Sequence, residues 1–258
     1  MSDTNLLAVE VRGGVLCVRI DRPQVHNALS RATLAALGEV FTRHAHDESI
    51  RAAVLTGAGE KSFAAGGDLK EFALIRTDAD ARALHRDASA ALDTMRRFPA
   101  PTVAALNGLA VGGGAELALA CDFRVAARHA KIGFVHATLA ITSGFGGGTD
   151  MMRLLGPGRG LLHALRAEPL DAVDALRAGL VDAVAGENET LEDCLSRFLE
   201  PILKRPPQVL RGYKAMALAE RMGEPPGRRQ QINEESFART WTHPDHWAAV
   251  ERRAVSRP

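Results

Sequence analysis

The feature that most constrains the fold is an order of segments that repeats along the first two thirds of the chain. Apolar, β-branched runs over 14–21, 52–60 and 101–108 each lead into a polar or glycine-containing turn, and two further short strands are expected over 123–127 and 130–135. Apolar residues then return at helical spacing over 31–45 and over about 79–98. Short strands that alternate with helices are typical of α/β proteins, which bind ligands at the loops between strands and helices. We therefore predict an α/β fold with its site at such loops.

The pattern changes near residue 190. The residues from 191 to 258 have almost entirely helical spacing, interrupted by "KRPPQ" and "GEPPGRR", whose prolines end helices. We predict a mixed core over 1–190 that holds the active site, followed by a helical C-terminal region over 191–258. Large apolar residues such as Trp241 and Trp247 in that region more often contact the core or another subunit than a ligand.

The composition excludes several functional classes. Lys and Arg number 32 against 31 Asp and Glu, and the arginines are scattered, so a nucleic-acid partner is not expected. The three cysteines lie far apart in the sequence, which fits neither a disulfide framework nor a zinc site and suggests a reducing compartment. The N-terminal "MSDTNLLAVEVRGG" has no signal-peptide pattern, and no stretch approaches the ~18 apolar residues of a membrane span. We expect a cytoplasmic protein without a membrane partner or a metal.

Two glycine stretches do not fit phosphate sites. In "GAGEKS" (57–62) Glu60 separates the last glycine from Lys61, whereas a phosphate-binding loop needs these two residues to be adjacent. The run "GFGGG" (144–148) does not follow the first strand of a βαβ unit, as a dinucleotide site requires. Neither stretch therefore predicts a nucleotide ligand.

Two other glycine stretches fit a different role. "SFAAGGDLKEF" (62–72) and "NGLAVGGGAELALACD" (107–122) each follow a strand and lead into a predicted helix. Glycines allow a tight turn with bare backbone N–H groups, which the positive end of the following helix reinforces. Two such N–H groups directed at one point form an oxyanion hole, in which losing one donor costs about 10²–10³ in rate.

These two stretches resemble the signature pair of the crotonase superfamily, the enoyl-CoA hydratase/isomerase family, "AFAAGADIK" and "NGxAxGGGxELAxxCD". The segments "IDRPQVHNALS" (20–30), "ALRAGLVDAV" (175–184) and "AAVERR" (248–253) extend the resemblance over nearly the whole chain. The resemblance implies a crotonase-like spiral of repeated ββα units, a C-terminal helical trimerisation region, and a homotrimer or homohexamer.

The resemblance also implies a small-molecule substrate, an acyl-CoA thioester whose carbonyl oxygen meets the N–H groups of Gly67 and Gly113. Coenzyme A then arrives as part of the substrate, and no tightly bound cofactor is implied. Phe145 and Trp241 are expected to line the acyl pocket, and Ala65 to offer its carbonyl to the adenine. The residues expected to contact coenzyme A are Arg22, Val25, Ala28, Ala65, Asp68, Leu69 and Lys70.

Two residues are the expected catalytic groups. Hydratases of this family use two glutamates, of which the first maps to Glu116, while ungapped counting puts His136 at the position of the second. Histidine side chains exchange protons near neutral pH and so suit acid–base catalysis. The alternative interpretation makes His136 a packed structural histidine and Glu116 a first-turn carboxylate favoured by the helix dipole.

The replaced glutamate leaves three possible functions. The segments 134–156 and 239–244 resemble the ethylmalonyl-CoA decarboxylase-like branch, which favours decarboxylation of a methylmalonyl- or ethylmalonyl-type CoA thioester, with His136 orienting the carboxylate or protonating the enolate. The second is an enoyl-CoA hydratase or isomerase in which His136 stands in for the glutamate. The third is a non-catalytic CoA-binding subunit. Ser143 and Gly148 depart from the proline and threonine of the commoner pattern and are expected to reshape the acyl pocket.

Overall fold

The structure, a computed structural model, describes residues 6–255; residues 1–5 and 256–258, which belong to the predicted core and C-terminal region, lie outside it. The strands are β1 (Leu7–Arg12), β2 (Val15–Ile20), β3 (Ala52–Gly57), β4 (Ser62–Ala64), β5 (Thr102–Leu106), β6 (Leu109–Val111), β7 (Phe123–Ala126), β8 (Lys131–Gly133), β9 (Leu170–Asp171) and β10 (Ala183–Val184). The helices are α1 (Arg31–His44), α2 (Leu69–Phe72), α3 (Asp78–Arg96), α4 (Gly113–Ala120), α5 (Gly147–Leu155), α6 (Pro157–Arg166), α7 (Ala172–Ala178), α8 (Leu191–Leu203), α9 (Pro207–Met222), α10 (Pro226–Trp241) and α11 (Pro244–Val255), with 3₁₀ turns η1 (Pro23–Val25) and η2 (His136–Leu139).

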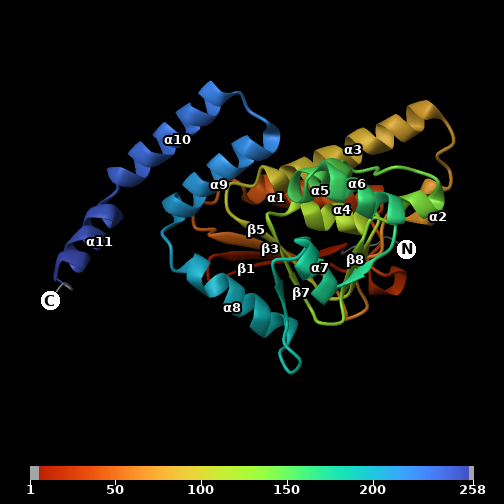
Figure 1. Cartoon of the computed structure of the whole chain (residues 1–258), viewed down its shortest axis with the longest axis horizontal. Helices are drawn as coiled ribbons and strands as arrows, with labels where there is room; N and C mark the ends of the chain where they lie inside the picture. The colour runs from red at the N-terminus through yellow and green to blue at the C-terminus, as the bar shows by residue number, and fades with distance from the viewer. Residues whose placement is uncertain (1–5, 256–258) are drawn as a thin grey trace.

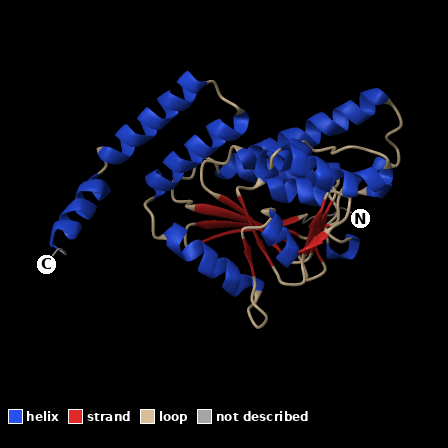
Figure 2. Cartoon of the chain, viewed as in Figure 1, coloured by secondary structure: helices blue, strands red, loops and turns tan. Residues whose placement is uncertain are grey.

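The strands form two sheets, and from β3 to β8 successive strands along the chain alternate between them. The larger sheet has the order β1-β2-β3-β5-β7-β10 and the smaller one β4-β6-β8-β9. Each pair β3/β4, β5/β6 and β7/β8 gives its first strand to the larger sheet and its second to the smaller one, in parallel with the preceding pair. Helices follow each pair, and α4, which follows β5/β6, is buried along its whole length (Figures 1 and 2). The predicted α/β spiral of ββα units is confirmed.

Reading the residues alone assigned one of the three second strands, β8, which lies within the predicted strand 130–135. It did not assign β4 and β6, which have three residues each and lie within stretches interpreted as glycine turns. Three residues are too few to establish the alternation of apolar and polar positions that identifies a strand. The longer strands β2, β3 and β5 lie within the predicted runs.

Glycines allow α4 to begin directly against the smaller sheet. A Cβ atom on Gly114 would lie 1.9 Å from the carbonyl oxygen of Ala64, the last residue of β4. No real Cβ contact is so short, so only glycine fits at this position. The first turn of α4 is thereby held at the end of β4, which places Glu116 beside the 64–68 loop.

The chain after Thr190, as far as the structure describes it, consists of helices. Lys214 of α9 contacts Asp122 at 2.5 Å and joins this helix to the core. Helix α10 packs along α9, and α10 and α11 extend away from the sheets (Figure 1). None of the described helices is both long and apolar enough to cross a membrane.

Candidate active site

The carboxylate of Glu116 is the centre of the densest polar cluster near the two glycine stretches. Glu116 lies in the first turn of α4, and the residue is completely buried. All its partners come from the segment between η2 and the start of α5. They are His136 Nε2 at 2.8 Å and Gly144 N at 3.0 Å from Oε1, and Ser143 Oγ at 2.5 Å, Phe145 N at 2.8 Å and Gly147 N at 2.7 Å from Oε2.

These donors keep Glu116 ionised despite its burial. Burial raises the pKa of its carboxyl group, but the hydrogen bonds from His136 and Ser143 and the charge of His136 outweigh that effect, so the pKa lies below its usual range. An ionised carboxylate only accepts hydrogen bonds, so the proton in the 2.8 Å contact belongs to Nε2 of His136. The nitrogen of the ring left for another partner is therefore Nδ1.

The glycine run 144–148 serves this carboxylate. A Cβ atom on Gly147 would lie 2.5 Å from both Cα and Cβ of Glu116, so α5 can start against α4 only with glycine there. The close approach brings three loop and helix N–H groups, those of Gly144, Phe145 and Gly147, within hydrogen-bonding distance of one carboxylate. The backbone of this run thus binds an anion, and that anion is the carboxylate of Glu116.

His136 is the member of the pair that reaches open space. Its side chain is 12% exposed, whereas that of Glu116 is 0% exposed. Sequence reasoning selected both residues but did not anticipate that they touch. It also treated Ser143 only as a residue that reshapes the pocket, although its hydroxyl donates to Glu116 and accepts from Gly148 N at 2.8 Å. A hydroxyl in place of the family's proline was the available signal.

The structure brings the two predicted oxyanion-hole glycines together. Gly113 is the first residue of α4, so its N–H has no partner within the helix. Leu29 bonds the backbone on both sides of Gly67, through Gly66 O at 2.8 Å and Asp68 N at 3.0 Å, so the N–H of Gly67 points away from Leu29. A Cβ atom on Gly66 would lie 3.8 Å from Gly113 N, which shows how closely the two turns approach.

The two residues predicted to line the acyl pocket lie in different parts of the molecule. Phe145 is 5% exposed and its ring packs on Gly113, beside Glu116. Trp241 ends α10, is 47% exposed, and its ring contacts Trp247 edge to face and His246 in a tilted arrangement. Within one chain the structure therefore does not bring Trp241 to Glu116, because α10 extends away from the core (Figure 1).

The predicted coenzyme A residues gather around one ion pair. Arg22 contacts Asp68 at 3.1 Å and donates to the carbonyl of Ala28 at 2.5 Å, so its guanidinium binds both residues. Asp68 also caps α2, which ties the 22–28 segment to the turn that holds Gly67. Among the other predicted contacts, Val25 and Ala65 are partly exposed, and Leu69 and Lys70 are exposed.

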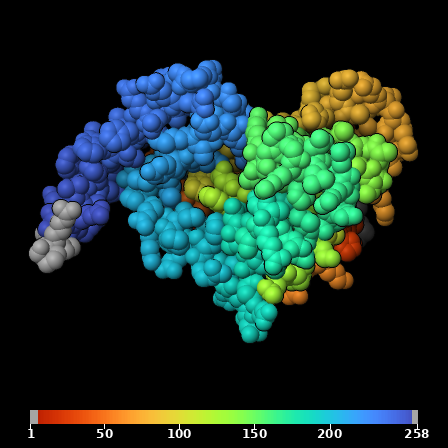
Figure 3. All heavy atoms as spheres, viewed as in Figure 1, coloured from red at the N-terminus to blue at the C-terminus, as the bar shows by residue number. Residues whose placement is uncertain are grey.

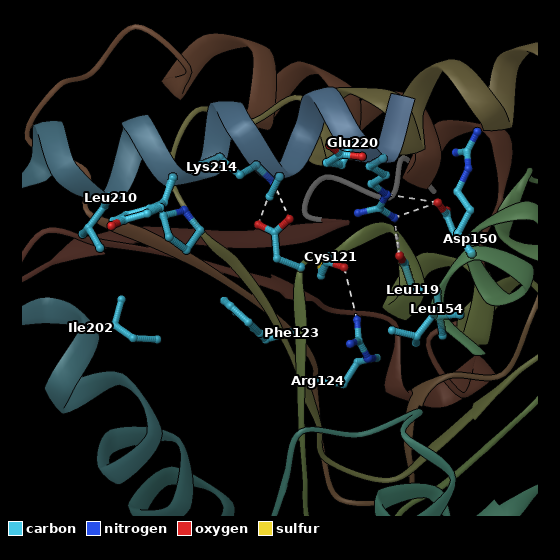
Figure 4. Close-up of a pocket in the computed structure, with 16 residues that line it drawn as sticks. Leu119, Cys121, Phe123, Arg124, Asp150, Leu154, Ile202, Leu210, Lys214 and Glu220 are labelled. Atoms are coloured by element: carbon cyan, nitrogen blue, oxygen red, sulfur yellow. Dashed lines mark hydrogen bonds and ion pairs between the residues drawn. The ribbon is translucent and has the colours of Figure 1, made fainter. Parts of the chain in front are cut away.

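A cavity lies away from Glu116 and His136, between α9 and the core (Figures 3 and 4). It has a volume of about 730 Å³, and its buried charges are paired: Lys214 with Asp122 and Arg221 with Asp150. Burial raises the pKa of Cys121 to about 12, so this thiol stays protonated. Among the residues described, no three His, Cys, Asp or Glu side chains are grouped to hold a metal ion. The chemistry therefore concentrates at Glu116 and His136.

Comparisons with known proteins agree with this fold. A family model described as enoyl-CoA hydratase/isomerase matches residues 10–251. The short-chain-enoyl-CoA hydratase of Clostridium acetobutylicum is 36% identical over 73% of this chain and 72% of its own length. The (E)-benzylidenesuccinyl-CoA hydratase of Thauera aromatica is 37% identical over 82% of both chains. A crystal structure of enoyl-CoA hydratase from Bacillus anthracis superposes with a TM-score of 0.89 at 30% identity, covering 98% of this chain and 97% of that one.

Proposed function

Because the chain belongs to the enoyl-CoA hydratase/isomerase family, we propose that it hydrates an enoyl-CoA thioester, with His136 in place of the family's second carboxylate. The observation that carries the proposal is the 2.8 Å contact between His136 and the buried anion Glu116. The relatives described above are named as hydratases, and their names give no support to the decarboxylation favoured by the sequence. The hydratase alternative therefore replaces it.

The thioester carbonyl is the group that the glycine turns would stabilise. Its oxygen would accept hydrogen bonds from the N–H groups of Gly67 and Gly113. These donors matter most when the oxygen gains negative charge in the enolate, so they lower the barrier and do not merely tighten substrate binding. Coenzyme A enters as part of the substrate, with the 22–28 and 65–70 segments as its proposed contacts.

His136 would move the proton. Nδ1 of the neutral ring takes a proton from water as the water oxygen bonds to Cβ of the enoyl group, and the electrons of the double bond pass into the thioester to form the enolate. The imidazolium then returns the proton to Cα, which restores the carbonyl, so one water molecule has been added in all. Glu116 remains ionised, fixes the tautomer through Nε2 and stabilises the imidazolium, as the aspartate of a catalytic triad does.

The remaining expectations belong to the same proposal. A helical C-terminal region with exposed Phe237, Trp241 and Trp247 supports assembly into a homotrimer or homohexamer, since large exposed apolar groups mark interaction surfaces. A cytoplasmic location is consistent with free cysteines at Cys17, Cys121 and Cys194. Neither feature enters the chemistry at His136.

The test is the loss of enoyl-thioester absorbance with crotonyl-CoA, measured for the natural protein, His136→Ala and, as a control at the C-terminal end of α1, His44→Ala. We expect hydration by the natural protein and by the control, and a loss of about 10²–10⁴ in kcat/KM for His136→Ala. Methylmalonyl-CoA and ethylmalonyl-CoA are assayed in parallel by mass spectrometry. Release of CO₂ without hydration of any enoyl-CoA would overturn the proposal, as would tight acyl-CoA binding with no turnover.

A further inference from the structure

Two phenylalanine rings cover the two glycines of the proposed oxyanion hole. A Cβ atom on Gly67 would lie 2.4 Å from Cε2 of Phe72, and one on Gly113 would lie 2.4 Å from Cε2 of Phe145. The rings also contact each other edge to face, with centroids 6.4 Å apart and planes at 86°. An aromatic pair therefore lies directly against both glycines.

Gly67 lies against the ring of Phe72 and has no side chain that would collide with it. Gly67 stands where the signature "AFAAGADIK" has alanine. An alanine methyl group would collide with the Phe72 ring in its present position, since Cδ2 would also lie only 2.8 Å away. The backbone at Gly67 has no left-handed conformation that would itself demand glycine. The ring is thus the steric reason for glycine at this position.

The two rings differ in how firmly they are held. The backbone N–H of Phe145 donates to Glu116 at 2.8 Å, so its position is coupled to the buried anion. Phe72 ends the four-residue helix α2, flanked by Leu69 and Leu74, which are 68% and 83% exposed. A short element with few buried contacts opens at low cost in free energy. Phe145 is accordingly the ring that is held in place, and Phe72 is the ring that can move.

We propose that Phe72 and Phe145 form the end wall of the acyl pocket and make the enzyme selective for short acyl chains. The inference rests on the proposed function, because the positions of the N–H groups of Gly67 and Gly113 define where the thioester carbonyl lies. An acyl chain that extends from that carbonyl past Glu116 meets the aromatic pair. A longer chain must displace the Phe72 ring, and Gly67 is the residue that lets the ring close.

The decisive experiment compares kcat/KM for trans-2-octenoyl-CoA with that for crotonyl-CoA. The natural enzyme is expected to prefer crotonyl-CoA, and Phe72→Ala to raise the octenoyl-to-crotonyl ratio about tenfold or more, since single methylene groups in a pocket already change specificity by about that factor. Phe198→Ala is the matched control, because Phe198 belongs to a similar edge-to-face pair with Phe123, at 5.5 Å, away from the glycine turns. Its ratio is expected to be unchanged.

Gly67→Ala tests the coupling between the glycine and the ring. The substitution keeps the backbone N–H but forces the Phe72 ring aside, so it is expected to raise the ratio in the same direction. Because both substitutions act through one ring, Gly67→Ala combined with Phe72→Ala is expected to raise the ratio no further than Phe72→Ala does. Additive effects of the two substitutions would contradict the proposed coupling.

A binding measurement separates this inference from the proposed reaction. Affinities for butyryl-CoA and octanoyl-CoA need no turnover, and Phe72→Ala is expected to increase the octanoyl-to-butyryl affinity ratio by a similar factor. If the natural protein hydrates no enoyl-CoA while this ratio still shifts, the proposed reaction fails and the pocket assignment stands. An unchanged ratio in a Phe72→Ala protein with a normal melting temperature would overturn the pocket assignment, whatever the reaction.

Discussion

Nε2 of His136 lies 2.8 Å from Oε1 of Glu116, and the carboxylate of Glu116 receives four further hydrogen bonds from the segment that follows His136. The glutamate is completely buried, whereas the histidine is partly exposed. Because the anion has no access to solvent, a proton exchanged with a substrate must pass through the ring. The two residues therefore have different roles in this division: His136 transfers the proton, and Glu116 carries the negative charge and keeps the ring of His136 in its orientation.

Glu116→Gln tests this division. The amide keeps the shape of the side chain but removes the charge, and its NH₂ group faces donors that need an acceptor. We expect kcat/KM for crotonyl-CoA to fall by about 10²–10⁴, as it does when a triad carboxylate is replaced by its amide. The unsatisfied donors should also lower stability by about 1–3 kcal/mol. Hydration that stays within about threefold of the natural enzyme, measured at saturating and limiting substrate, would show that the charge is not needed.

Ser143→Ala should change the pH dependence of the reaction. Its hydroxyl is one of the groups that lower the pKa of Glu116, so removing it should raise that pKa. The acidic limb of the kcat/KM profile should then move to higher pH, because Glu116 becomes protonated sooner as the pH falls. Thr138→Ala is the control, since Thr138 donates to Val135 O at 2.7 Å and lies exposed outside the cluster. A Ser143→Ala profile that coincides with that of Thr138→Ala would show that the hydroxyl of Ser143 does not help to lower the pKa of Glu116.

The depressed pKa of Glu116 also predicts how stability depends on pH. A carboxyl group whose pKa is lower in the folded than in the unfolded chain stabilises the fold fully above the unfolded value, here 4.5, and that contribution is lost as the pH falls through the folded value. Thermal unfolding scans should therefore give a difference in melting temperature between the natural protein and Glu116→Gln that is constant near neutral pH and shrinks below about pH 4.5. A difference that widens in acid would mean that burial dominates after all.

Gly114→Ala is expected to lower the melting temperature and the soluble yield, while the fold should tolerate a methyl group at an open glycine. The new Cβ would lie 1.9 Å from the backbone oxygen of Ala64, which cannot move without shifting β4, and overpacking typically costs about 1–3 kcal/mol. Gly158→Ala is the control, because no atom lies within 4 Å of the added methyl group and the residue is in α6. Soluble yield and melting temperature measure both. A stable Gly114→Ala protein would mean that β4 and α4 are less closely packed.

The sequence predicted the architecture better than the site. Strands over 15–20, 52–57 and 102–106 and the helix α3 fall within segments whose apolar periodicity is long enough to read. The contact between Glu116 and His136 could not be read, because it depends on a loop that returns from η2 to α5 and on glycines that let α5 approach α4. The distance of Trp241 from this pair is likewise set by the direction of α10, which local patterns do not specify.

The anchoring of α9 gives the last prediction. Lys214 is almost fully buried and contacts both oxygens of Asp122, at 2.5 and 2.6 Å; burial lowers the pKa of the lysine, and Asp122 opposes that effect. Lys214→Met should destabilise the protein by about 3–5 kcal/mol, because Asp122, whose side chain is only 17% exposed, is left without its cation. Combining Lys214→Met with Asp122→Asn should recover part of the loss, since the remaining charge is removed.

Lys204→Met, which breaks an exposed pair with Glu200, is the control and should leave the denaturation midpoint unchanged. If both lysine variants unfold at the same denaturant concentration as the natural protein, the buried pair does not anchor α9.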